Sequence, residues 1–143
     1  MPLIKRKMER IKRRELFMQM AQLVSQRSSC PKKQVGAVLV REGRVVCIGY
    51  NGTLPGVPAE EGMDGEGVTH TVHAEANIIS FCAKEGIPTD GTDMYITLSP
   101  CEKCAELLVQ AGVEHVYYLE TYRDTTGVRL LKRNDIFCRP YTK

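Results

Sequence analysis

Two short stretches of the sequence carry side chains that ligate metals. Cys101 and Cys104 form a Cys-x-x-Cys pair, and His73 is followed two residues later by Glu75. Taken alone, Cys-x-x-Cys fits a redox pair, half of a structural zinc site or half of a catalytic zinc site about equally well. His73 adds a third ligand and leaves one position of a tetrahedral zinc ion open, which is typical of catalytic sites. The spacing therefore predicts one Zn²⁺ ion bound by His73, Cys101 and Cys104.

Glu75 is expected to act in catalysis and not to bind the metal. Side chains two positions apart on a helix point to different sides, so Glu75 is poorly placed to share a metal with His73. Two thiolates leave a zinc site with little net positive charge, so the metal alone should not fully ionise its water. A nearby base must take that proton, and we assign this role to Glu75.

The start of a helix should hold the two thiols. Pro100 suits the first helical position, and Ser99 followed three residues later by Glu102 reads as a capping box. Backbone N–H groups and the positive end of the helix dipole at such a terminus favour thiolates. We therefore expect the capping box to open the helix that carries both cysteines.

The rest of the pattern predicts an α/β fold. A Glu42-Gly43 turn joins two β-branched apolar runs into a hairpin, whose continuous hydrophobicity indicates burial on both faces. Helices then alternate with strands, so the later strands should be parallel. We expect a three-layer α/β/α sandwich with a five-stranded mixed sheet. The expected helices cover residues 11–27, 73–84, 101–110 and 124–131, and the expected strands cover 34–40, 44–50, 94–98, 113–119 and 136–138.

The length and composition indicate one globular domain over residues 1–143. Hydrophobic residues make up 43% and charged residues 26%, and no apolar run approaches the roughly 18 residues of a membrane span. These values exclude fibrous, disordered and membrane-spanning classes. No secretory leader is apparent, so we expect a cytoplasmic protein.

The net charge of +3 is unevenly placed. Seven of the 20 basic residues and one of the 17 acidic residues lie in the first fourteen positions, which leaves a net −3 on the remainder. Residues 1–10 read as a basic N-terminal extension, and the body of the chain is not a polycation.

Six cysteines are too few for a disulfide scaffold. Outside the Cys-x-x-Cys pair, we expect Cys30, Cys47, Cys82 and Cys138 to be small buried side chains.

His-x-Glu with Pro-Cys-x-x-Cys is the established signature of zinc nucleobase deaminases. From Leu23 to Ile136 the sequence resembles the cytidine deaminase superfamily, and within it the deoxycytidylate (dCMP) deaminases, including bacteriophage members. The resemblance rests further on Arg27-Ser28-Ser29-Cys30, Val35-Gly36-Ala37-Val38, Gly49-Tyr50-Asn51-Gly52 and Glu120-Thr121-Tyr122.

This resemblance implies hydrolytic deamination of dCMP to dUMP and ammonia, which feeds thymidylate synthesis. Water activated at zinc would attack the amidine carbon, while Glu75 protonates the ring nitrogen and then the departing amino group. It also implies a homohexamer that is activated by dCTP with Mg²⁺ and inhibited by dTTP. Membrane and nucleic-acid partners are not expected.

The resemblance also assigns further residues. Asn51 would reach the substrate, the Ala74 backbone would read the base, and Tyr50 and Gly52 would lie near an allosteric nucleotide. Candidates for the substrate phosphate are Arg27, Ser28 and Tyr122. Some relatives hold a second, structural zinc through an insertion before the His-Ala-Glu helix, but residues 55–68 contain no cysteine or histidine, so only one zinc is expected.

Three alternatives stay open. The basic N-terminus could indicate a tRNA or other nucleic-acid deaminase, although the acidic loop over residues 51–70 argues against a polyanion. A free-nucleoside deaminase would need no phosphate site. A non-enzymatic zinc or redox module would leave Glu75 without a role.

Overall fold

The computed structural model describes residues 8–58 and 71–143, in four helices and five strands. Most of the predicted N-terminal extension and of the 55–68 segment lies outside the described residues. The helices are α1 (Arg13–Ser25), α2 (Ala74–Glu85), α3 (Glu102–Ala111) and α4 (Thr126–Arg133). The strands are β1 (Gly36–Arg41), β2 (Arg44–Tyr50), β3 (Thr92–Leu98), β4 (Val113–Glu120) and β5 (Phe137–Pro140).

The strands form one mixed sheet in the order β2-β1-β3-β4-β5. β1 is antiparallel to β2 and β3, while β3, β4 and β5 are parallel to one another. The parallel pairs are those joined by the crossover helices α3 and α4, as the alternation of helices and strands predicted. The five-stranded mixed sheet is thereby confirmed.

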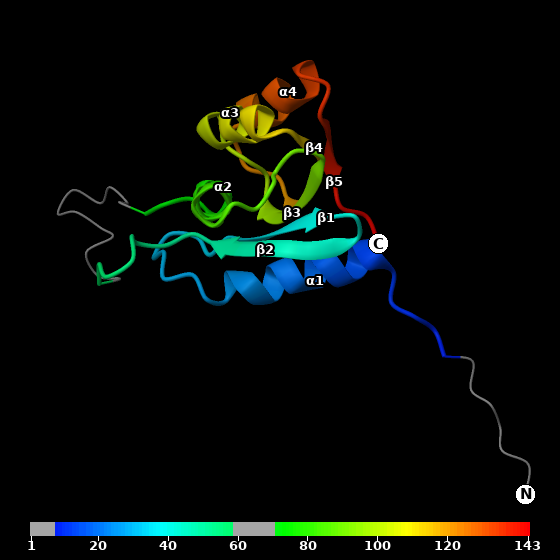
Figure 1. The fold of residues 1–143 in the computed structure, drawn as a ribbon, viewed down its shortest axis with the longest axis horizontal. Coiled ribbons are helices and arrows are strands. Elements are labelled where there is room, and N and C mark those ends of the chain that lie inside the picture. The colour runs from blue at the N-terminus through cyan, green and yellow to red at the C-terminus, as the bar shows by residue number, and fades with distance from the viewer. Residues whose placement is uncertain (1–7, 59–70) are drawn as a thin grey trace, which may run out of the picture.

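Helices cover the two faces of the sheet unequally (Figure 1). On one face α1 buries Phe17, Met18 and Ala21 against β1 and β3. The other face carries α2, α3 and α4, whose buried side chains join the larger core cluster. This arrangement is the predicted three-layer α/β/α sandwich. No helix within the described ranges has both the length and the apolar character needed to cross a membrane.

Two local predictions were wrong. β2 is not buried on both faces, because it is an edge strand, and Ile48 is 53% exposed. The capping box does not form either: α3 begins at Glu102 with Cys101 at its N-cap and no side-chain capping bond. The Ser99 hydroxyl instead accepts a 2.7 Å hydrogen bond from the N–H of Tyr122, which ties the start of α3 to the end of β4.

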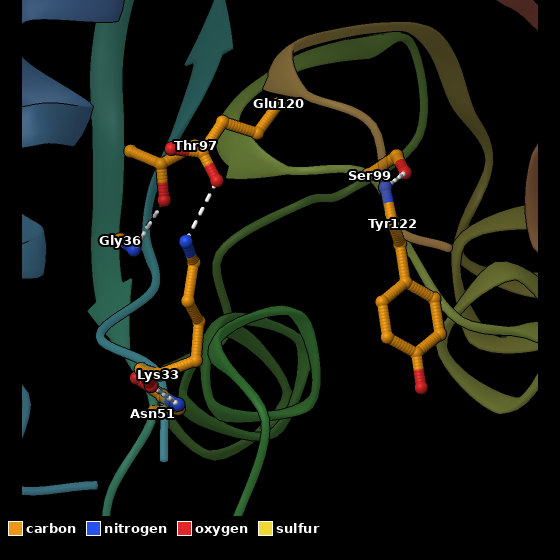
Figure 2. Close-up of polar contacts among 7 residues, drawn as sticks. All are labelled: Lys33, Gly36, Asn51, Thr97, Ser99, Glu120 and Tyr122. Atoms are coloured by element: carbon orange, nitrogen blue, oxygen red, sulfur yellow. Dashed lines mark hydrogen bonds and ion pairs between the residues drawn. The ribbon is translucent and has the colours of Figure 1, made fainter. Parts of the chain in front are cut away.

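One edge of the sheet gathers the chain ends that carry the predicted chemistry. β3 and β4 are parallel, so their carboxyl ends lie together, with Leu98 opposite Glu120. β1 runs antiparallel to β3, and the N–H of Gly36 donates to Thr97 Oγ1 at the same edge (Figure 2). Ligand sites in α/β proteins favour this carboxyl edge of parallel strands.

Candidate active site

The structure brings the three predicted metal ligands together at two helix starts. His73 is the N-cap of α2, Cys101 is the N-cap of α3, and Cys104 lies in the first turn of α3. Their ligand atoms all lie within 4.8 Å of one another, with His73 Nδ1 3.6 Å from Cys101 Sγ and 3.3 Å from Cys104 Sγ. One imidazole and two sulfurs match the donors that zinc prefers. The cluster therefore fits Zn²⁺ with three protein ligands.

The cluster is electrostatically prepared to bind a cation. Hydrogen bonds from Cys104 and His73 lower the pKa of the Cys101 thiol to about 4. The hydrogen bond to Cys101 raises the pKa of His73, and the same thiolate, together with burial, raises the pKa of Cys104. The metal-free protein thus holds one thiolate and retains protons that a metal ion would displace on binding.

Glu75 lies beside this cluster in a dry environment. Glu75 is only 4% exposed, and burial raises the pKa of its carboxyl group to about 7. A carboxyl group that titrates near neutral pH can both accept and return a proton under ordinary conditions. Its position next to the ligand cluster suits an acid and base function.

A cavity of about 240 Å³ opens onto these groups. His73, Glu75 and Cys101 line it, so two of the predicted metal ligands and the buried carboxyl group face one space. Three more of the residues singled out in the sequence line the same cavity: Asn51, Ala74 and Tyr122. The structure therefore gathers residues from four separate parts of the chain around one small-molecule site.

Asn51 is held by the protein through its whole side chain. It is 6% exposed; its Nδ2 donates to the carbonyl of Lys33 at 2.7 Å, and its Oδ1 accepts from the N–H of Val35 at 2.8 Å. The hydroxyl of Ser28 lies 2.5 Å from the same Oδ1. Asn51 therefore fastens residues 28–35 to the edge of the cavity, a structural function that the sequence did not indicate.

Two of the three phosphate candidates, Arg27 and Ser28, lie outside the cavity lining. Ser28 is buried and bonded to Asn51, and neither Ser28 nor Arg27 is among the described residues that line the cavity. The guanidinium of Arg27 lies instead 5.9 Å from the centre of the Tyr50 ring. Of the three phosphate candidates, only Tyr122 lines the cavity.

Tyr50 and Gly52, the residues placed near an allosteric nucleotide, are engaged by the segment around α2. The carbonyl of Tyr50 accepts a 3.0 Å hydrogen bond from Asn77 Nδ2. Gly52 forms an isolated antiparallel bridge with Val72, directly before His73. The turn after β2 is thus joined to the chain that delivers the imidazole.

Two lysines in the cavity wall were missed. Lys32 and Lys33 lie between Pro31 and the strand that begins at Gly36, and both line the cavity. The sequence shows that they directly precede the first predicted strand. It does not show the hydrogen bonds with Asn51 that hold this segment at the cavity.

Cys30 also lines the cavity and is only partly buried, unlike its expected state. Burial acts to raise the pKa of its thiol, but hydrogen bonds from the backbone N–H groups of Lys33 and Lys32 outweigh burial, and the pKa is lowered. Cys47, Cys82 and Cys138 are buried as expected, and burial raises the pKa of each.

Comparison with known proteins places these features in a family. The cytidine and deoxycytidylate deaminase zinc-binding region matches residues 11–120. The chain is 43% identical to ComE operon protein 2 of Bacillus subtilis (strain 168) over 81% of its length, but spans only 64% of that relative. It is 39% identical to the deoxycytidylate deaminase of Mus musculus, covering 82% of this chain and 72% of the mouse protein.

A solved structure agrees with these relatives. The dCMP deaminase from the cyanophage S-TIM5, in complex with dCMP and dUMP, superposes with a TM-score of 0.81 at 34% identity, covering 89% of this chain and 95% of the phage chain. The match over residues 11–120 includes β1 to β4 and the whole ligand cluster. The chain therefore belongs to the cytidine and deoxycytidylate deaminase family.

Proposed function

We propose that this protein catalyses the zinc-dependent hydrolytic deamination of dCMP to dUMP and ammonia. The observation that carries the proposal is the meeting of a His-Cys-Cys cluster and a buried carboxyl group in one cavity. The substrate is supported by the relatives named deoxycytidylate deaminase and by the phage structure that contains dCMP and dUMP.

In this mechanism His73, Cys101 and Cys104 would hold one Zn²⁺ ion. When bound, the ion would supply Lewis-acid activation of water. Glu75 would accept one proton from the attacking water, because its carboxyl group lines the same cavity as His73 and Cys101. It would deliver this proton to the pyrimidine ring nitrogen. It would then take the second proton from the hydroxyl group now on the attacked carbon and deliver it to the departing amino group, so that the carbonyl forms and ammonia leaves. Exclusion of water around Glu75 strengthens its interaction with the ring.

The surrounding residues bind and orient the substrate. The backbone of Ala74, which is fully buried between His73 and Glu75, would read the polar edge of the base. Asn51 would act by fixing residues 28–35, in keeping with its hydrogen bonds to that segment. Tyr122 would form a wall of the substrate site, since it lines the cavity.

Ammonia release from dCMP, deoxycytidine and dAMP, measured side by side with zinc-loaded protein, tests the substrate. We expect dCMP to give the highest kcat/KM. A preference for deoxycytidine would instead identify a free-nucleoside deaminase, and activity on dAMP would overturn cytosine selectivity. If none of the three is deaminated, the remaining alternatives are a nucleic-acid deaminase and a non-enzymatic zinc module.

Assembly and regulation form a finer part of the proposal. By family resemblance we propose a cytoplasmic homohexamer of single-domain chains, activated by dCTP with Mg²⁺ and inhibited by dTTP, with Tyr50 and Gly52 near the effector. Light scattering with and without dCTP and Mg²⁺ tests the assembly, and dCTP and dTTP titrations of the initial rate test the regulation.

A further inference from the structure

Lys33 is a cation of the cavity wall that already has an anionic partner. Its Nζ lies 2.7 Å from Oε2 of Glu120, and the two side chains are 51% and 57% exposed. Figure 2 shows the Lys33 side chain extending from its backbone, near Asn51, toward Glu120 at the end of β4. The pair links the segment before β1 to the strand end that precedes Tyr122.

Hydrogen bonds hold the backbones of Lys33 and Glu120 in place, whereas among the described residues their side chains are held only by each other. Asn51 Nδ2 binds the carbonyl of Lys33, and the carbonyl of Glu120 accepts a 2.9 Å hydrogen bond from the N–H of Ser99. Each side chain is about half exposed and makes no other side-chain hydrogen bond among those of the described residues. Lys33 can therefore change partners without any movement of the main chain.

In an ion pair of this kind, a more highly charged anion readily replaces the carboxylate as the partner of the lysine. Exposed lysine–carboxylate pairs contribute little to stability, because water screens them and the lysine side chain loses entropy in forming them. A nucleotide 5′-phosphate carries up to two negative charges and three acceptor oxygens, against one charge on a carboxylate. A phosphate that enters the cavity mouth would compete well with Glu120 for the ammonium group.

We propose that Lys33 determines the preference for a 5′-phosphorylated substrate, and that Glu120 is the counter-charge which Lys33 leaves when that phosphate binds. This inference rests on the proposed function, in which a nucleotide is deaminated in the cavity. Glu120 has a second effect, because its carboxylate repels the incoming phosphate and so weakens nucleotide binding. Arg27, the cation favoured by the sequence, lies over Tyr50 and outside the cavity lining.

The two partners therefore have opposite effects on substrate preference, and this gives a direct test. The quantity to measure is the ratio of kcat/KM for dCMP to kcat/KM for deoxycytidine, in zinc-loaded full-length protein. Lys33→Gln should lower the ratio about tenfold, the scale of one charge-assisted hydrogen bond. Glu120→Gln should raise it about two- to threefold, and the double variant should resemble Lys33→Gln. Lys33→Arg should keep most of the preference, because it keeps the charge.

Lys132→Gln on α4 is the matched control, since it removes the same charge from a residue that does not line the cavity. Its ratio should stay within about 1.5-fold of the parent protein, because distant exposed charges are screened. Thermal melts of each variant check that it is folded.

The inference is overturned if Lys33→Gln leaves the ratio unchanged, or if Lys33→Gln and Glu120→Gln both lower the rates on the two substrates equally. The second result would make the pair a structural clamp. These failures differ from a failure of the proposed function, in which the parent protein itself shows no preference for dCMP; that result would also remove the phosphate inference.

Discussion

Asn51→Ala is the perturbation that most sharply separates anchoring of the cavity wall from direct substrate contact. The carboxamide forms three hydrogen bonds within the protein, to the backbone of Lys33 and Val35 and to the hydroxyl of Ser28. Alanine removes all three and leaves the two backbone groups without their partners. Each such group costs about 1–3 kcal/mol when it is shielded from water, so we expect the free energy of unfolding to fall by about 3 kcal/mol.

The assay is urea unfolding at a fixed zinc concentration, followed by circular dichroism. For a chain of this length the same loss corresponds to a melting temperature lower by roughly 10 °C. Thr53→Ala is the control, because its hydroxyl makes one exposed hydrogen bond, to the carbonyl of Val57, and its loss should cost under about 0.5 kcal/mol. An Asn51→Ala loss below about 1 kcal/mol, with turnover abolished, would refute anchoring and make Asn51 purely a substrate residue.

Three further predictions concern the metal site and the thiols. A Cβ atom added to Gly127 would overlap the carbonyl oxygen of Pro100, so Gly127→Ala must displace α4 from the turn that leads into Cys101. We expect zinc affinity, measured by chelator competition, to fall at least about tenfold, and unchanged affinity would contradict this packing argument. In zinc-free protein, burial raises the pKa of Glu75 from 4.5 to about 7, so the folded state loses stability as pH rises between these values. Glu75→Gln should therefore be more stable than the parent by about 3 kcal/mol above pH 7 and equally stable at pH 4, in urea unfolding with a chelator; a difference independent of pH would contradict it. With zinc bound, iodoacetamide followed by mass spectrometry should label Cys30 well before the buried Cys138, and equal labelling rates would contradict the thiol pKa directions.

The ligand cluster could be predicted from sequence because its determinants are local. His73 and Cys101 each stand at the N-cap of a helix, and Cys104 follows within one turn, so short-range spacing fixes which side chains can meet once the helices pack. The order of helices and strands likewise determined which strands are parallel. The α/β sandwich followed from this alternation together with the opening hairpin.

The features that were missed depend on contacts between distant parts of the chain. Ser99 is favourably placed in sequence to cap the helix. Its hydroxyl instead accepts a hydrogen bond from the N–H of Tyr122, because β3 and β4 end side by side. Lys33 and Glu120 are 87 residues apart, and only the sheet order brings them together. The exposure of β2 similarly follows from its place at the edge of the sheet, which its apolar composition conceals.

The central claim is that Glu75 moves protons while three other side chains hold the metal. Glu75→Gln tests it most directly, when zinc content per chain and ammonia release from dCMP are measured on the same sample. The account predicts one zinc ion per chain, as in the parent protein, and turnover reduced by about 10²- to 10⁴-fold. Turnover near that of the parent in the zinc-loaded variant, or full activity in parent protein stripped of zinc, would contradict the account.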